Sequence, residues 1–219
     1  HPNGMTFRAH TSAGLYEHTY YSIGGGFVVS DASEEVGKNM VKTPFQCNSG
    51  DDALRYCTQL KLSFAQLIRA NEHAWHNDTS IDNQALALWT VMKETIYRGL
   101  ISSEQVLPGG LNVKRRAPLM LGKLMNSSPQ SANELFDHIR EETFDFAQIN
   151  TWVSTFALAV NEENAGYGQI VTSPTNGASG VLPSVMAYAY CFLPNISEQH
   201  MIESILVAGE IGTYFKKGA

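Results

Sequence analysis

The sequence has 219 residues, with 15 lysines and arginines against 21 aspartates and glutamates, which gives a formal net charge of −6. An acidic chain has no overall electrostatic footprint for nucleic acid or for an anionic membrane, so both are excluded as general partners and a small molecule or another protein is expected. Hydrophobic residues make up 43% of the chain, and no apolar run reaches the roughly 20 residues of a membrane-spanning helix, so we expect a soluble globular protein.

Three cysteines, Cys47, Cys57 and Cys191, form neither a C-x-x-C pair nor an even set for disulfides. This usage favours a reducing compartment, and we predict a cytoplasmic protein. The chain opens without an initiator methionine and closes inside an apparent helix. We therefore interpret it as an internal fragment of a longer protein.

The first 30 residues are rich in β-branched and aromatic types and predict strands. A hairpin is expected from residues 5–9 and 16–21, followed by a short strand at residues 27–29. Because two or three strands do not form a stable sheet alone, residues 1–30 are predicted to be the last strands of a β-containing domain. The polar residues 31–48 are predicted to be a linker.

Helical periodicity replaces the strand pattern after the linker, and residues 49–219 are predicted to be the first part of an all-helical domain. Serine side chains accept backbone N–H groups at helix starts, and a glycine often follows a helix end. The sequence therefore predicts that helices start at Ser49, Ser63, Ser80 and Ser131, and that one helix ends at Gly99.

Three further helices are predicted, near residues 145–164, 180–192 and 197–217. Between Trp152 and Val160 the sequence is apolar nearly all round, which is typical of a central buried helix. The fold class is therefore α+β, a predominantly helical bundle preceded by the last strands of a β-containing domain.

A loop rich in hydroxyl, glycine and amide groups, residues 172–180, leads directly into one of these helices. Such a loop offers unpaired N–H groups at the positive end of a helix dipole, which suits a carboxylate or another anion. The alternative is a capped loop that only joins two helices.

A second polar stretch ends the apolar helix and consists of Asn161, Glu162, Glu163 and Asn164. Burying an unpaired carboxylate is costly, so these side chains must find partners, face a cavity or emerge into solvent.

Other features carry less weight. His73 and His76 lie three residues apart but lack the H-E-x-x-H order, so metal binding is not predicted there. Three glycines at residues 24–26 precede a strand instead of a helix, so they are no dinucleotide fingerprint. The cysteines are too dispersed for a local cluster site, and Cys191 is interpreted as core packing.

Six short motifs follow one another along the chain, at residues 1–5, 21–27, 106–109, 113–117, 157–165 and 171–178. Each is weak alone, but in this order they resemble the bacterial iron–sulfur-dependent L-serine dehydratases (L-serine ammonia-lyases). The resemblance implies a β-containing domain followed by an all-helical catalytic domain. It also implies a lyase that converts L-serine to pyruvate and ammonia, in which one iron of a [4Fe-4S] cluster acts as a Lewis acid and a base removes the α-proton.

The same resemblance implies site residues on several segments. The candidate catalytic residues are His1, a proton carrier or a structural imidazole, and Asn3. The candidate substrate-binding residues are Ser22, Gly24, Gly25, Gly26, Asn161, Asn164, Thr175, Asn176 and Gly177. The family's cluster cysteines lie beyond the last helix of this chain, and Cys47, Cys57 and Cys191 match none of them. No metal ligand is assigned, and we expect this chain alone to be inactive.

Two other functions stay open. One is a related iron–sulfur enzyme acting on another small amino acid, such as a cysteine desulfidase. The other is a non-catalytic helical interaction module, for which the basic run Lys114, Arg115 and Arg116 is the only support. The expected partner is L-serine, with no nucleic acid and no membrane, and a homodimer is left open.

Overall fold

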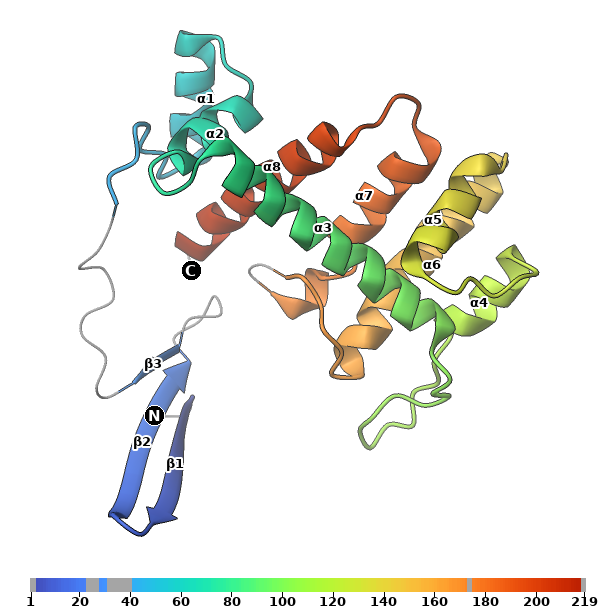
Figure 1. The fold of residues 1–219 in the computed structure, drawn as a ribbon, viewed down its shortest axis with the longest axis horizontal. Coiled ribbons are helices and arrows are strands. Elements are labelled where there is room, and N and C mark those ends of the chain that lie inside the picture. Colours follow the sequence, from blue (N-terminus) through green and yellow to red (C-terminus); the bar gives the residue numbers. More distant parts are fainter. Residues whose placement is uncertain (1–2, 23–27, 31–40, 173–174, 218–219) are drawn as a thin grey trace.

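The computed structural model describes residues 3–22, 28–30, 41–172 and 175–217. The predicted fold class is confirmed, because these residues form a mainly helical α+β structure (Figure 1). The helices are α1 Gly50–Leu60, α2 Phe64–Glu72, α3 Asp78–Ile101, α4 Ala117–Leu124, α5 Ala132–Glu141, α6 Phe146–Ala165, α7 Val181–Phe192 and α8 Glu198–Lys217. No helix among the described residues is long and apolar enough to cross a membrane.

The strands form one small antiparallel sheet in the order β1-β2-β3, with bounds Gly4–Thr11, Gly14–Ser22 and Val28–Ser30. The predicted hairpin is confirmed, and β3 covers Val28 and Val29 of the short strand expected at residues 27–29, whose first residue lies outside the described residues. Phe7 pairs with His18 and Met5 with Tyr20, so one face carries apolar and aromatic side chains. The whole of β1 is exposed to solvent. The division of the chain into two domains and a linker stays a prediction.

Local capping explains where most helices begin. Ser49, Ser63 and Ser131 each accept a backbone N–H in the first turn, as predicted. The prediction for Ser80 is wrong, because Asn77 caps α3 and its Oδ1 accepts from the Ser80 N–H at 2.9 Å. An equally good capping residue three positions upstream therefore places the start of α3 at Asp78.

Gly99 does not end α3, contrary to the prediction, since the helix continues to Ile101. A Cβ placed on Gly99 would lie 2.4 Å from the Ala159 carbonyl oxygen. Glycine is thus needed here for the close crossing of α3 over α6, and its C-terminal position in the helix is incidental. A glycine that ends a helix and a glycine that allows two helices to cross closely cannot be distinguished in a single sequence.

Gly99→Ala is expected to destabilise the protein by about 1–3 kcal/mol, because the added methyl group overpacks the crossing of α3 and α6. Gly122 in α4 is the matched control, since a Cβ there meets nothing within 4 Å. Gly122→Ala is expected to stabilise by about 0.5–1 kcal/mol through its helix propensity. Urea unfolding measures both changes, and two stabilising alanines would contradict the close crossing.

The predicted central helix is confirmed in α6. Trp152, Phe156, Ala159 and Val160 are 0% exposed. Helices α3, α4 and α7 pack against α6, and the Phe156 ring stacks on Phe136 of α5 at 5.9 Å between centroids. Helices α1 and α2 lie beside α8 at one end of the long α3, while α4 and α5 lie toward its other end (Figure 1). The end of α6 is thereby fixed in a rigid frame.

Candidate functional site

The polar loop that begins at Thr172 returns to α6 through a single glycine. The loop contains a short 3-10 turn, Asn176–Ala178, and α7 follows after Gly180. A Cβ on Gly180 would lie 2.6 Å from the Ala157 carbonyl oxygen and 2.8 Å from Asn161 Oδ1. Only glycine allows this approach, which sets the start of α7 against the face of α6 that carries Asn161.

Two predicted site residues from different elements meet as an amide pair. Asn164 at the end of α6 donates from Nδ2 to the Asn176 carbonyl oxygen at 3.3 Å, and Asn176 Nδ2 donates to Asn164 Oδ1 at 3.3 Å. Asn161, Thr175, Asn176 and Gly177 are exposed nearby. The loop and the last turn of α6 therefore offer solvent-accessible neutral donors and acceptors, the groups that recognise a small polar molecule.

The two carboxylates between Asn161 and Asn164 have found partners, which decides between the alternatives left by the sequence. Glu162 Oε1 accepts from the Arg116 N–H at 2.7 Å and Oε2 from the Ala117 N–H at 3.1 Å, so this carboxylate caps the start of α4. Glu163, 8% exposed, accepts from Arg115 Nη1 at 3.1 Å. These are structural roles that hold the last turn of α6 in place.

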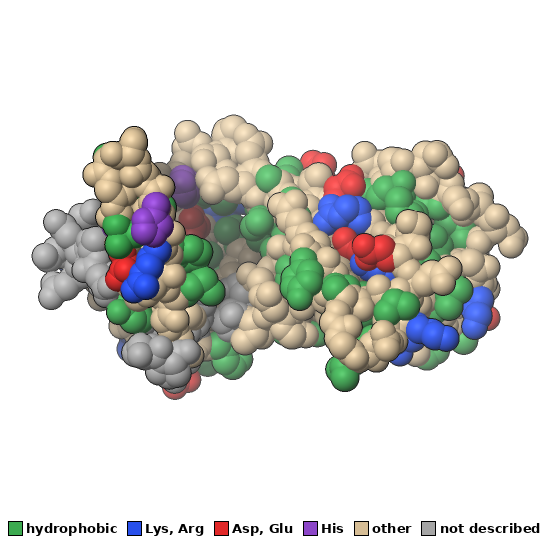
Figure 2. Space-filling view, turned by 90° about the horizontal axis from the view of Figure 1, so that it is seen from below, with side chains coloured by type: hydrophobic (Ala, Val, Ile, Leu, Met, Phe, Trp, Pro, Cys, Tyr) green, Lys and Arg blue, Asp and Glu red, His purple; other side chains and the backbone are tan. Residues whose placement is uncertain are grey.

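Arg115 is buried between two carboxylates. It is 5% exposed, and its Nη2 also donates to Glu104 Oε2 at 2.9 Å. The basic run Lys114, Arg115 and Arg116 therefore does not present three cations to solvent, because the middle side chain pairs with carboxylates inside the fold. On the face drawn in Figure 2, acidic and basic side chains are interspersed.

The chain between α6 and the loop is tied to α3. The Gln169 carbonyl oxygen accepts from Thr95 Oγ1 at 2.9 Å and from Arg98 Nη2 at 2.8 Å. Arg98 Nε also donates to Glu163 at 3.5 Å. A Cβ on Gly168 would lie 2.6 Å from Glu163 Oε2 and 3.1 Å from the Glu163 carbonyl oxygen, so a side chain there would displace the Glu163 carboxylate. Sequence reasoning missed Thr95 and Arg98, since nothing local signals a partner more than 70 residues away.

The predicted site residues of the first segment are brought together only in part. Ser22 N–H donates to the Asn3 carbonyl oxygen at 3.0 Å, at the open end of the hairpin. His1, Gly24, Gly25 and Gly26 lie outside the described residues. The joint action of this segment with the loop stays a prediction.

The cysteines do not fit an iron–sulfur cluster. Cys191 packs against the main core, and burial raises the pKa of its thiol to about 12. Burial also raises the pKa of Cys47, which packs with Cys57 in a separate cluster at α1 and α2. Cluster ligands are thiolates that converge on one site. In the described part of the chain, no three His, Cys, Asp or Glu side chains are placed to hold a metal ion.

Comparison with known proteins agrees with the motifs. Residues 59–219 match the serine dehydratase alpha chain family, and residues 1–33 match the serine dehydratase beta chain. The chain belongs to the serine dehydratase alpha chain family. The L-serine dehydratase of Streptomyces coelicolor is 38% identical over 228 residues, and L-serine dehydratase 1 of Escherichia coli is 39% identical over 223 residues.

Each of these alignments covers 100% of the chain and 46% of the relative. The chain thus spans about half the length of the curated relatives it matches. The resemblance drawn from six motifs is confirmed at the level of the family. Within this family, the amide pair and the polar loop are the candidate site that the described residues provide.

Proposed function

We propose that the chain belongs to an iron–sulfur L-serine dehydratase, a lyase that converts L-serine to pyruvate and ammonia. The observation that carries this proposal is the alignment of the entire chain, at 38% and 39% identity, with two relatives named L-serine dehydratases. The polar, accessible loop supports it, because a serine zwitterion offers a carboxylate, an ammonium group and a hydroxyl to such groups.

In this proposal serine lies against the amide pair. Thr175, Asn176 and Gly177 bind its carboxylate or amino group, with Asn161 and Asn164 on the same side, and all of these lie on or beside the loop. The remaining candidates come from the first segment: Ser22 and the three glycines at 24–26 close the site, and His1 or Asn3 takes part in proton transfer. The solvent-exposed Asn3 and Ser22 support this assignment, because groups that act on a substrate must be accessible.

The whole enzyme is proposed to carry a [4Fe-4S] cluster whose ligands are residues other than Cys47, Cys57 and Cys191. We propose a division into the end of a β-containing domain at residues 1–30, a linker at 31–48 and a helical catalytic domain from 49 onward. A cytoplasmic location and a homodimer complete the proposal. The interaction-module alternative loses its support, because Arg115 of the basic run is buried in ion pairs.

The test uses the intact enzyme with its cluster reconstituted under anaerobic conditions. L-serine is expected to give pyruvate and ammonia in equal amounts, with a kcat/KM about tenfold or more above that for L-cysteine, since a site that binds a hydroxyl group rejects an analogue that lacks it. Faster release of sulfide from L-cysteine would identify a desulfidase instead. A fully loaded enzyme that acts on neither amino acid would refute the lyase assignment.

A further inference from the structure

Two cationic side chains from different helices lie against one tyrosine ring of α7. Arg140 of α5 has its Cζ 4.5 Å from the centre of the Tyr190 ring, and its Nη1 donates to the Tyr190 hydroxyl at 3.1 Å. Lys93 of α3 has its Nζ 5.9 Å from the same ring centre and donates to Asn133 Oδ1 at 3.2 Å. We call these four residues, Lys93, Asn133, Arg140 and Tyr190, the cation cluster.

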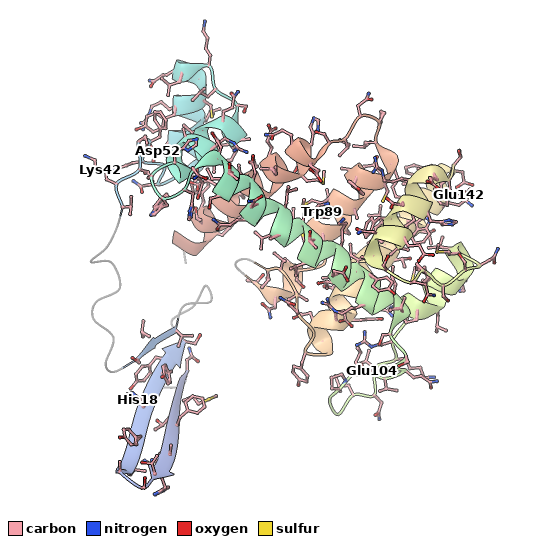
Figure 3. The ribbon with its side chains drawn as sticks, in the orientation of Figure 1. His18, Lys42, Asp52, Trp89, Glu104 and Glu142 are labelled. Carbon is pink, nitrogen blue, oxygen red and sulfur yellow. The ribbon has the colours of Figure 1, made fainter. Side chains whose placement is uncertain are left out.

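The Tyr190 ring is held in place by the main core. Trp89, labelled in Figure 3, and Phe136 meet it in edge-to-face arrangements, with ring centres 5.6 and 6.1 Å away. A cation near an aromatic face is attracted by the quadrupole of the ring, which restrains a long side chain. The positive charges of Arg140 and Lys93 are therefore brought to one place where α3, α5 and α7 meet.

Arg140 differs from the other arginines in its partners. Each of the other six pairs with a carboxylate: Arg8, Arg55, Arg69, Arg98, Arg115 and Arg116. Arg140 contacts a neutral hydroxyl and a neutral ring, and Lys93 a neutral amide and the same ring. Among the described residues, no carboxylate forms an ion pair with either side chain. The cation cluster thus holds two positive charges that these residues do not neutralise.

The cation cluster also has hydrogen-bond donors that its own contacts do not use. A guanidinium group has five N–H donors and an ammonium group three, and one of each is engaged within the cluster. The Tyr190 hydroxyl accepts from Arg140, so its own O–H remains to donate. Hydrogen bonds from charged donors to an anion are the strong ones. Two charges and several donors suit an anion with two negative charges and several oxygen atoms, whereas a monocarboxylate would neutralise only one cation.

The cation cluster is separate from the candidate substrate site. Helix α7 begins after Gly180, directly behind the polar loop, and Tyr190 lies in its last turn. At 1.5 Å per residue, the two ends are about 14 Å apart along the helix. No residue of the cation cluster belongs to the amide pair or to the loop, so a ligand bound here does not occupy the place of serine.

We propose that the cation cluster binds a phosphate dianion, either as inorganic phosphate or as the phosphate monoester of a small molecule. Arg140 and Lys93 donate to its oxygen atoms from α5 and α3, and the Tyr190 hydroxyl donates to it from α7. The bound anion offsets the repulsion between the two cations, which is unfavourable in the free protein. The proposal is independent of the reaction that the whole enzyme catalyses.

The test is calorimetric titration of the full chain with phosphate, methyl phosphate and acetate at low, constant ionic strength and about pH 8, where phosphate is mainly a dianion. Phosphate is expected to bind about tenfold more tightly than acetate, because it can engage both cations. Equal affinity for phosphate and acetate would overturn the dianion site. Methyl phosphate that binds as tightly as phosphate would extend the site to monoesters, and much weaker binding would restrict it to the inorganic ion.

Three charge-removing variants locate the anion. Arg140→Gln and Lys93→Gln are each expected to weaken phosphate binding about tenfold, since each removes a charged donor. Lys123→Gln is the matched control, because Lys123 is an exposed lysine of α4 outside the cation cluster. Salt screens its charge, so the affinity is expected to stay within about twofold. Equal weakening in all three variants would show an effect of net charge alone and refute the site, as would unchanged binding in Arg140→Gln.

Asp137→Asn is expected to act in the opposite direction. Asp137 lies on α5 one turn before Arg140, is exposed, and forms no ion pair with the described residues. Its negative charge opposes an anion nearby, so its removal is expected to strengthen phosphate binding about two- to threefold. Weaker binding in Asp137→Asn would contradict the location. These titrations require no turnover, so a failed anion site is distinguished from a failed assignment as a serine dehydratase.

Discussion

Glu163→Ala is expected to lower the free energy of unfolding by about 3–5 kcal/mol, because it leaves the buried Arg115 guanidinium without its buried partner. Glu163 is 8% exposed, Arg115 is 5% exposed, and their side chains are 3.1 Å apart. The same change removes an acceptor of Arg98, which ties the chain after α6 to α3. Urea unfolding monitored by circular dichroism measures the loss.

Glu104→Ala is the matched control, because Glu104 pairs with the same guanidinium from the surface. Its side chain is 62% exposed, on the segment after α3 (Figure 3). Solvent screens such a pair, so a loss of only about 0–1 kcal/mol is expected. Similar small losses for both variants would mean that Arg115 finds water when Glu163 is removed, and that the pair is not a structural requirement.

Replacing both partners tests the cause. In Glu163→Met with Arg115→Met, no uncompensated charge remains, and most of the stability lost in Glu163→Ala is expected to return. If the double variant is as unstable as Glu163→Ala, the lost stability comes from the changed packing of the side chains and not from an uncompensated charge. The distinction matters for the site, because Glu163 immediately precedes Asn164 of the amide pair.

Local rules predicted the elements whose ends are set by neighbouring residues. Ser63 and Asp145 each form a capping box with the residue three positions on, and both helix starts agree with the prediction. Helix α4 was missed because its capping position, Arg116, supplies no side-chain cap. Its N–H groups are satisfied by Glu162, which is distant in sequence, so no local pattern signals the start.

The candidate site likewise contains some residues that a local sequence pattern indicates and others that only the fold brings together. Asn164 and Asn176 stand in two polar stretches that the sequence marks beside apolar helices, and the family resemblance implied both as site residues. They lie only 12 positions apart. Thr95 and Arg98 carried no such signal. Their shared partner is the Gln169 carbonyl oxygen, more than 70 positions along the chain, and only the folded chain brings these groups together.

Asn176→Asp in the intact enzyme is expected to lower kcat/KM for L-serine by about ten- to a hundredfold. Aspartate has the same shape, but at neutral pH its carboxylate donates no hydrogen bond and repels the substrate carboxylate. It also faces Asn164 Oδ1, the present acceptor of Asn176 Nδ2 at 3.3 Å, and turns a donor–acceptor contact into two opposed oxygens. Because Asn176 is exposed, stability and cluster content are expected to change little.

Asn195→Asp provides the comparison, since Asn195 is another exposed asparagine and lies in the turn between α7 and α8. Its kcat/KM is expected to stay near that of the unchanged enzyme. If Asn176 only satisfies its own turn, aspartate serves equally well there, because both side chains cap turns and tolerate the same backbone. Near-normal kcat/KM in a fully loaded Asn176→Asp enzyme would then remove Asn176 from the substrate site. The amide pair would remain as a structural joint between α6 and the loop, and serine would have to bind elsewhere.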